Sequence, residues 1–308
     1  STATDPPRTP LSAWVQGARP RTLPAAVVPV AVGAGVAAGI GATGEALGDG
    51  VGDGVVWWRV VTALGVSLLL QIGVNYANDY SDGVRGTDDA RVGPVRLVAS
   101  GAAAPAAVRT AALASLGLAA VLGLVLAATT SWWLLAIGAG ALLASWGYTG
   151  GPKPYGYLGL GELFVFVFFG LVATAGTTYV AGLGIPAVTW PAAVAVGLLA
   201  CALLVVNNLR DLSTDRAAGK LTLAVRLGDE RTRRLYVGLV VGAFLCVAVC
   251  GGWRPWALLA LFGLRVARDP IRAVLDGASG PDLIPVLGET GRTQMVFGAL
   301  FAVGLALG

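Results

Sequence analysis

Residues 71–89 read QIGVNYANDYSDGVRGTDD, a polar stretch that begins inside a long apolar segment. Its first polar side chains are spaced by 4, 3, 1 and 3 residues, which places them on one face of a helix. These residues are Gln71, Asn75, Asn78, Asp79 and Asp82. Because polar side chains are costly inside a bilayer, we expect this stripe to face the interior of a helical bundle. Gly83 and Gly86 predict the end of the helix, and Asp88 and Asp89 follow in a turn.

A second polar stretch, VVNNLRDLSTDRAAGK at residues 205–220, also ends an apolar segment. Asn207, Asp211 and Asp215 recur every four residues and therefore share one helical face. The two stretches carry the same residue types, and we expect them at the same depth on the same side of the membrane.

Apolar segments make up most of the remaining chain. The 308 residues are 56% hydrophobic and only 12% charged, with a mean hydropathy of +0.76, whereas soluble domains are about a quarter charged. A membrane-spanning helix needs about 20 mainly apolar residues. The segments that qualify are Leu23–Ile40, Trp57–Tyr80, Val108–Ala128, Trp132–Tyr148, Leu158–Ala181, Trp190–Leu209, Leu235–Cys250, Trp253–Val266 and Gln294–Leu307. The sequence thus predicts an all-α, polytopic membrane protein with about nine transmembrane helices in one bundle. We expect residues 1–18 to be a disordered cytoplasmic tail and residues 19–308 to form a single transmembrane domain.

The positions of the basic residues predict the orientation of the chain. If the N-terminus is cytoplasmic, all 21 Lys and Arg residues except Arg59 and Arg254 fall in cytoplasmic segments. Such a bias is typical of cytoplasmic loops, so we expect the C-terminus outside and both acidic stretches at the cytoplasmic face. It also argues against nucleic acid as a partner, although the net charge is +4. The chain has no histidine, which excludes histidine bases and histidine metal ligands.

The two polar stretches combine carboxylates, amides and basic side chains. Mg²⁺ is typically held by one or two carboxylates together with substrate phosphates. Arg85 and Arg91 follow the first stretch, and Arg210 and Lys220 lie in the second. Metal ions and basic groups neutralise the charge that develops on a departing diphosphate. The sequence therefore indicates an enzyme that binds a diphosphate ester and Mg²⁺ at the cytoplasmic face. The alternative is that these charges only solvate cytoplasmic loops.

These motifs resemble those of the UbiA-type intramembrane prenyltransferases, and the resemblance covers nearly the whole chain. NDYSD at 78–82, with Asp88, looks like the first motif of that family, and DLSTD at 211–215 looks like the second. Three further stretches resemble the branch that acts on 1,4-dihydroxy-2-naphthoate in menaquinone biosynthesis. They are GPVRLVASG at 93–101, YTGGPKPYGYLGLGE at 148–162 and GKLTLAVRLG at 219–228. The resemblance implies Mg²⁺-dependent transfer of a polyprenyl chain from its diphosphate to the naphthoate in the cell membrane, with loss of CO₂ and diphosphate, giving demethylmenaquinone.

Roles for individual residues follow from these two lines of reasoning. We expect Mg²⁺ ligands at Asn78, Asp79, Asp82, Asp88, Asp211 and Asp215. We expect diphosphate contacts from Arg85, Arg91, Lys153, Arg210 and Lys220. We expect acceptor or prenyl contacts from Gln71, Asn75, Tyr148, Tyr155 and Asn207. The catalytic residues are predicted to be Asp82, Asp211, Asp215 and Lys153.

Several alternatives stay open at this point. Gln71 and Asn75 could instead form hydrogen bonds between helices, and Lys153 and the two tyrosines could be interfacial anchors. Glu162 is either a helix-start residue or a site carboxylate. The acceptor could be 4-hydroxybenzoate, haem, chlorophyllide or a glycerol phosphate. A secondary transporter is the alternative outside this family, because transporters also bind ions with intramembrane Asp and Asn.

Overall fold

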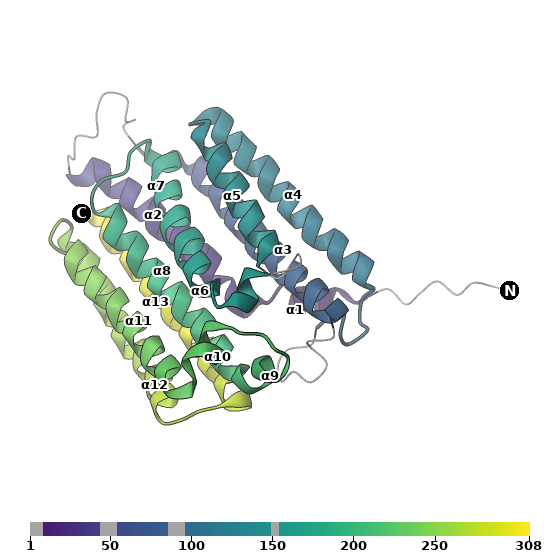
Figure 1. Cartoon of the computed structure of the whole chain (residues 1–308). Helices are drawn as coiled ribbons and strands as arrows, with labels where there is room; N and C mark the ends of the chain where they lie inside the picture. The colour runs from purple at the N-terminus through teal and green to yellow at the C-terminus, as the bar shows by residue number, and fades with distance from the viewer. Residues whose placement is uncertain (1–8, 44–53, 86–95, 149–153) are drawn as a thin grey trace.

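The structure is a computed structural model that describes residues 9–43, 54–85, 96–148 and 154–308, and this part of the chain is helical without strands (Figure 1). The first half contains α1 (Leu11–Gly17), η1 (Pro20–Thr22), α2 (Pro24–Thr43), α3 (Trp57–Arg85), α4 (Pro105–Thr129), α5 (Trp133–Gly147), η2 (Tyr155–Leu158), α6 (Gly161–Val165), η3 (Phe166–Val172) and α7 (Ala173–Gly182). The second half contains α8 (Thr189–Arg210), α9 (Leu212–Ala217), α10 (Leu223–Leu227), α11 (Asp229–Cys250), η4 (Pro255–Gly263), α12 (Leu264–Leu275), η5 (Gly280–Asp282) and α13 (Leu283–Leu307). The all-α prediction is confirmed for the residues described.

Each of the nine apolar segments is helical in the structure. Among the described residues, six helices are long and apolar enough to cross a membrane, or seven if Leu11–Thr22 and the bent continuation Pro24–Ile40 form one span. Trp133–Gly147 is apolar but shorter than the others. The segment after Trp253 begins as the 3₁₀ helix η4 and continues as α12, which carries three arginines. The long helices lie side by side in Figure 1, as a multi-pass bundle requires.

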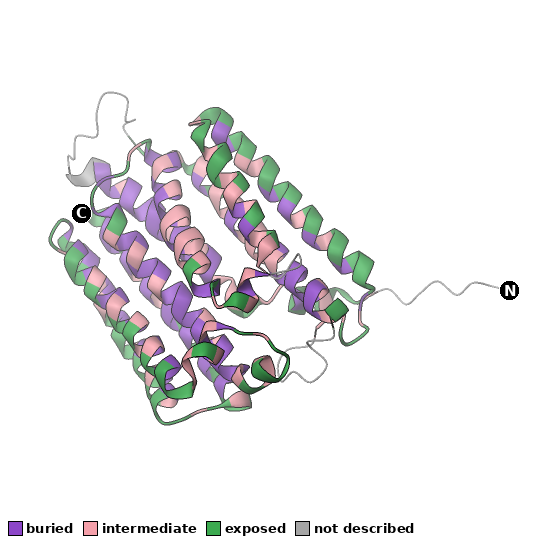
Figure 2. Cartoon of the chain, in the orientation of Figure 1, coloured by how far each residue is buried: buried purple, intermediate pink, exposed green. Residues whose placement is uncertain are grey.

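Helix α8 forms the centre of the bundle, and Figure 2 shows it largely buried while α4 carries exposed residues along its length. Its buried side chains form one hydrophobic core with residues of α2, α11, η4 and α13. Close approach between α2 and α13 depends on glycine, because a Cβ atom at Gly35 or Gly39 would collide with the backbone of α13 at Ala302 or Leu305. Small residues permit such packing between helices in membranes, where water does not drive them together.

Helix α1 corrects the prediction for the N-terminal tail. Residues 1–18 were expected to be disordered, but Leu11–Gly17 is helical and packs on α3. The Tyr76 hydroxyl donates to the Trp14 carbonyl oxygen at 2.9 Å, and the two rings meet edge to face. The helix ends before Arg19, because the residue that precedes a proline is disfavoured in the α conformation. Tyr76 therefore holds α1 against α3, although composition alone assigns α1 to a disordered tail.

The two arginines outside the predicted cytoplasmic segments are bound to helix ends. Arg254 is 0% exposed, and its Nη1 donates to the carbonyl oxygens of Val36 and Leu305, each at 2.8 Å. The Arg59 guanidinium donates to the carbonyl oxygen of Thr129, the last residue of α4, at 2.8 Å. Thr129 and Leu305 lie in the last turns of α4 and α13, where carbonyl groups lack partners inside the helix and carry partial negative charge. Val36 lies inside α2, so Arg254 also joins α2 to α13.

Candidate active site

The first acidic stretch is buried at the end of α3, where Asp79 and Asp82 are 1% and 2% exposed. Asp79 Oδ2 accepts a hydrogen bond from the Leu97 N–H at 2.9 Å, and its Oδ1 accepts one from the Val98 N–H at 3.0 Å. These bonds hold the turn at residues 97–100 against α3. Asp79 thus has a structural contact that its spacing did not indicate, and its role as a Mg²⁺ ligand stays a prediction.

Asp82 is the residue at which three parts of the chain meet. Its Oδ1 accepts a hydrogen bond from the Tyr157 hydroxyl at 2.6 Å, and its Oδ2 forms a salt bridge with Lys220 Nζ at 3.5 Å. The ammonium of Lys220 also lies 4.8 Å from the centre of the Tyr157 ring, and the Arg85 guanidinium lies 5.5 Å from it. Cations at these distances are attracted to the face of an aromatic ring. The salt bridge connects the two acidic stretches directly.

In the second stretch, an arginine neutralises the first aspartate. Arg210 donates to both carboxylate oxygens of Asp211, at 2.8 and 2.7 Å, and to Asn207 Oδ1 at 3.0 Å. Arg210 and Asp211 are both buried, so the pairing satisfies charges that would otherwise be costly. A guanidinium has five N–H donors, so these contacts leave Arg210 with further N–H groups, and its contact with a diphosphate stays a prediction.

A tight loop after Asp215 carries Lys220 back to Asp82. The Lys220 N–H donates to the Asp215 carbonyl oxygen at 2.8 Å, which closes the loop. Gly219 adopts a φ of 71°, in the left-handed region that glycine enters without steric cost. This turn gives Lys220 a position that a continuing helix would not provide.

Aromatic residues border the acidic stretches. The Tyr148 and Tyr155 rings meet edge to face with centroids 5.5 Å apart, and Tyr155 stacks on Phe164 at 3.9 Å. Tyr155 donates its hydroxyl to the Ala144 carbonyl oxygen at 2.7 Å, and burial raises the pKa of Tyr155 above its ordinary value. Both rings are therefore fixed, and Tyr155 presents a neutral phenol beside the site.

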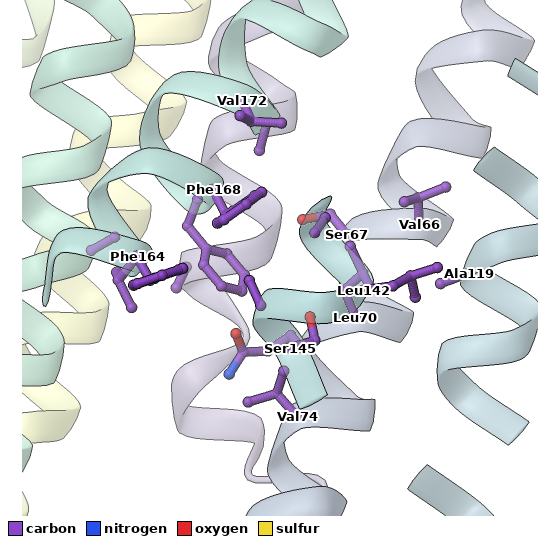
Figure 3. A pocket seen from close by; sticks show the side chains of 18 of the residues that line it. Val66, Ser67, Leu70, Val74, Ala119, Leu142, Ser145, Phe164, Phe168 and Val172 are labelled. Atoms are coloured by element: carbon purple, nitrogen blue, oxygen red, sulfur yellow. The ribbon is translucent and has the colours of Figure 1, made fainter. Parts of the chain in front are cut away.

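A single cavity of about 1340 Å³ connects these polar groups to the apolar interior of the bundle. At its polar end lie Gln71, Asn75, Asn78, Asp79, Asn207 and Arg210, together with both tyrosines. Figure 3 shows the apolar part, where Val66, Leu70 and Val74 of α3 face Phe164, Phe168 and Val172. The cavity continues to Trp133 and Trp190, at the opposite ends of the helices. Its shape suits a molecule with a charged head and a long apolar tail.

A π-helical segment forms one wall of this cavity. Phe166–Val172 is the π helix η3, and Phe168 and Val172 on it line the cavity. Gly170 lies so close to Gly197 of α8 that an added Cβ would be 2.5 Å from its Cα atom. Short π-helical segments occur frequently at functional sites, and this one lies beside the apolar part of the pocket.

The donors at the polar end fit Mg²⁺ that binds together with a diphosphate. Among the described residues, no three acidic or thiol side chains are close enough to enclose a metal by themselves. Mg²⁺, however, usually takes one or two carboxylates and completes its shell with water and phosphate oxygens. Asn78 and Asn207 line the polar end with their amide groups, and Asp82 and Asp211 follow them by four residues each. The roles of Asn78, Asp82 and Asp211 as Mg²⁺ ligands stay predictions. Asp88, Arg91 and Lys153 were also predicted for the site but lie outside the described residues.

The sequence reasoning missed two residues at this site. Tyr157 lies in the stretch YGYLGLG, and only its neighbour Tyr155 was chosen. Arg19 lines the cavity, although it was counted only as a topology signal. The Arg19–Pro20 pair directly before an apolar segment is a weak signal for a fixed turn. Arg96 also lines the cavity; it follows the first acidic stretch with Arg85 and Arg91 but was given no individual role.

Comparison with known proteins identifies the class to which this fold and site belong. Residues 21–268 match the UbiA prenyltransferase family, and the chain belongs to this family. It is therefore a multi-pass membrane protein and a prenyltransferase, which confirms the resemblance seen in its motifs.

Individual relatives carry more specific names. The 1,4-dihydroxy-2-naphthoate octaprenyltransferase of Mycobacterium tuberculosis is 51% identical over 295 residues, which cover 96% of this chain and 97% of the relative. The enzyme of the same name from Escherichia coli is 34% identical over 96% of this chain and 95% of its own. A UbiA homolog from Archaeoglobus fulgidus, solved with DMAPP and Mg²⁺, has the same fold with a TM-score of 0.55 at 18% identity, covering 94% of this chain and 99% of that one.

Proposed function

We propose that the protein transfers a polyprenyl chain from polyprenyl diphosphate to 1,4-dihydroxy-2-naphthoate in a Mg²⁺-dependent reaction. The products are CO₂, diphosphate and a prenylated dihydroxynaphthalene, which is the reduced form of demethylmenaquinone. The names of relatives at 51% and 34% identity support the acceptor. No residue in the described part of the chain favours 4-hydroxybenzoate, haem, chlorophyllide or a glycerol phosphate over this acceptor.

The observation that carries the proposal is the contact between Asp82 and Lys220. It joins the two acidic stretches one helical turn beyond Asn78 and Asn207, which line the polar end of a cavity whose remainder is apolar. A diphosphate at this end would meet the donors of Lys220 and Arg210, and a prenyl chain would extend along Leu70 and Phe168. A secondary transporter would not need an apolar chamber beside its ion site.

The basic side chains assist departure of the diphosphate. When the allylic C–O bond breaks, its electron pair leaves with the diphosphate, and donors already aimed at that oxygen lower the barrier. Mg²⁺, when bound through Asp82 and Asp211, would neutralise further charge on the same group. Lys220 and Arg85 hold position through the Tyr157 ring, so the site is organised before the charge develops.

The acceptor ring then forms the new C–C bond. Tyr148 and Tyr155 present aromatic rings beside the site, and such rings stabilise the positive charge of an allylic cation. Overall, the ring gains the prenyl group and loses its carboxylate as CO₂, whose bonding electron pair stays with the ring. The reaction therefore releases no net proton, and a strong general base is not required.

We also propose that all nine apolar segments cross the membrane within one domain at residues 19–308, with the N-terminus and active site cytoplasmic and the C-terminus outside. The distribution of Lys and Arg supports this orientation. Single cysteines introduced at two exposed positions test it. A membrane-impermeant thiol reagent should label Ala187→Cys in intact cells, but should label Ser213→Cys only after the cells are opened. The reverse pattern would contradict the orientation.

The test of function is a direct assay. Purified protein is incubated with polyprenyl diphosphate and 1,4-dihydroxy-2-naphthoate, with and without Mg²⁺, and prenylated product is identified by mass. We expect product from the native chain with Mg²⁺ and none from Asp82→Ala or Asp211→Ala. Product only with 4-hydroxybenzoate would contradict the acceptor but retain the diphosphate site. A folded protein that prenylates no acceptor would contradict the proposed function as a whole.

A further inference from the structure

Arg19 has an unusual backbone and an unsatisfied side chain at the wall of the cavity. Its φ is 54°, and it is one of two non-glycine residues with a positive φ among the described residues. Its Nη2 atom is buried without a hydrogen-bond partner, and the residue lines the cavity. A strained backbone and a buried N–H donor without a partner are both unfavourable, and such features concentrate at functional sites.

The polar stripe of α3 holds this strained turn in place. Asn75 Nδ2 donates to the Ala18 carbonyl oxygen at 2.8 Å and to Thr22 Oγ1 at 3.2 Å. The Thr22 hydroxyl donates to the Arg19 carbonyl oxygen at 2.9 Å. The peptide groups on both sides of the Arg19 Cα atom are therefore fixed from α3. This arrangement supports the hydrogen-bonding alternative for Asn75 and also aims the Arg19 side chain.

Gln71 adds a hydrogen-bond acceptor beside this cation. Its Nε2 donates to Thr22 Oγ1 at 3.2 Å and to Asn75 Oδ1 at 3.4 Å. Its Oε1 accepts no hydrogen bond from the described residues, and Gln71 lines the cavity. A cationic donor and a neutral acceptor thus lie on one wall, which matches a molecule that carries both an anionic group and a hydroxyl.

The cavity wall formed by Arg19 and Gln71 lies away from the diphosphate donors along the axis of α3. Asn75 precedes Asp82 by two helical turns, about 10 Å at the usual rise. Lys220 contacts Asp82, and Arg210 lies next to Asp211, so cations already serve the diphosphate end. Arg19 is therefore a cation separate from those that meet the diphosphate, and it is available to an anionic group on the acceptor.

We infer that Arg19 binds the carboxylate of an aromatic hydroxy acid acceptor, and that Gln71 Oε1 accepts a hydrogen bond from its hydroxyl. The inference rests on the proposed function, because it assigns the acceptor end of the same site. Arg19 would orient the ring and would select acceptors that carry a carboxylate. A bidentate guanidinium suits that group better than an ammonium does.

The test uses Arg19→Gly, because glycine adopts a positive φ without strain and the substitution therefore removes the side chain without disturbing the turn. Arg19→Lys is the conservative variant, and thermal unfolding in detergent verifies that each variant folds. Binding of 1-hydroxy-2-naphthoate and of 1-naphthol to the full chain is measured by the fluorescence of the ligands. The KM values for the naphthoate acceptor and for polyprenyl diphosphate are measured separately.

We expect Arg19→Gly to weaken naphthoate binding by about ten- to a hundredfold, the effect of losing a hydrogen bond between charged groups. Binding of 1-naphthol and the KM for polyprenyl diphosphate should stay within about twofold, and Arg19→Lys should restore part of the naphthoate binding. A rise in the KM for polyprenyl diphosphate instead, or unchanged naphthoate binding, would overturn the inference. Failure of the proposed function is distinguishable, because the native chain would then form no product even if it bound the naphthoate through Arg19.

Discussion

The hydroxyl of Tyr157 is the smallest group whose removal tests the organisation of the site. Tyr157→Phe deletes the donor that lies 2.6 Å from Asp82 Oδ1 and keeps the ring that Lys220 and Arg85 contact. A hydrogen bond to a charged group contributes about 1.5–3 kcal/mol. Lys220 still pairs with Asp82 in the variant, so we take the lower limit, and about 1.5 kcal/mol corresponds to about a tenfold change in rate.

We therefore expect Tyr157→Phe to lower kcat/KM for polyprenyl diphosphate about tenfold and to raise the Mg²⁺ concentration needed for half-maximal activity. The KM for the acceptor should change less than about twofold, because the hydroxyl donates to Asp82, at the proposed metal and diphosphate end. Steady-state kinetics with Mg²⁺ titration at saturating acceptor measure these quantities.

Tyr155→Phe is the matched control for this experiment. It removes a hydroxyl of the same kind, but one that donates to a neutral backbone carbonyl oxygen, that of Ala144. We expect it to lower thermal stability slightly and to leave the Mg²⁺ requirement unchanged. If Tyr157→Phe has the kcat/KM and Mg²⁺ dependence of the native chain, the hydrogen bond to Asp82 does not position the site. Equal effects of both variants would indicate a general loss of stability.

The remaining predictions concern the leaving-group cation and the packing of the bundle. Lys220→Met should lower kcat by about a hundredfold or more, the effect of losing one preorganised donor, whereas Lys220→Arg should retain part of the activity. If the two variants were equally active, a role for the charge at position 220 would be excluded. Arg254→Met should lower the free energy of unfolding by about 2 kcal/mol or more, because two buried carbonyl oxygens lose their donor, and Arg234→Met is the control because its salt bridge is exposed on the surface. Gly39→Ala should prevent close packing of α2 against α13 and reduce the yield of folded protein in size-exclusion chromatography. Gly117→Ala should be tolerated, because the space around that residue is open.

Spacing along single helices predicted the acidic stripes, but not how they meet. Asp211 and Asp215 were expected on one helix with Asn207, but Asp211 is the residue between α8 and α9, so the helix is interrupted there and Asp215 lies on α9. The salt bridge between Lys220 and Asp82 joins residues 138 positions apart and depends on the turn at Gly219. No local pattern encodes such a contact, so the convergence of the two stretches could only be inferred from their shared chemistry.

The helix boundaries that the sequence missed have a similar cause. The last apolar segment was expected to begin at Gln294, whereas α13 begins at Leu283. Thr290, Thr293 and Gln294 are at most 2% exposed, so the bundle buries polar residues that hydropathy assigns to its surface. Helix α12 continues beyond the predicted end at Val266 because its arginines face outward while Ala267 and Val274 pack inward. Hydropathy averages over both faces of a helix and cannot separate them.

Arg254 and Arg59 both donate hydrogen bonds inside the folded protein, and this affects how the distribution of basic residues along the chain is interpreted. They are the two exceptions to the bias of basic residues, and simple counting treats them as evidence against the assigned orientation. Arg59 donates to the carbonyl oxygen of Thr129 at the end of α4, and Arg254 donates to Val36 of α2 and Leu305 of α13 at the same time. Each cation is therefore a crosslink inside the folded protein, and its position in the sequence reports how the helices pack rather than on which side of a membrane the loop lies.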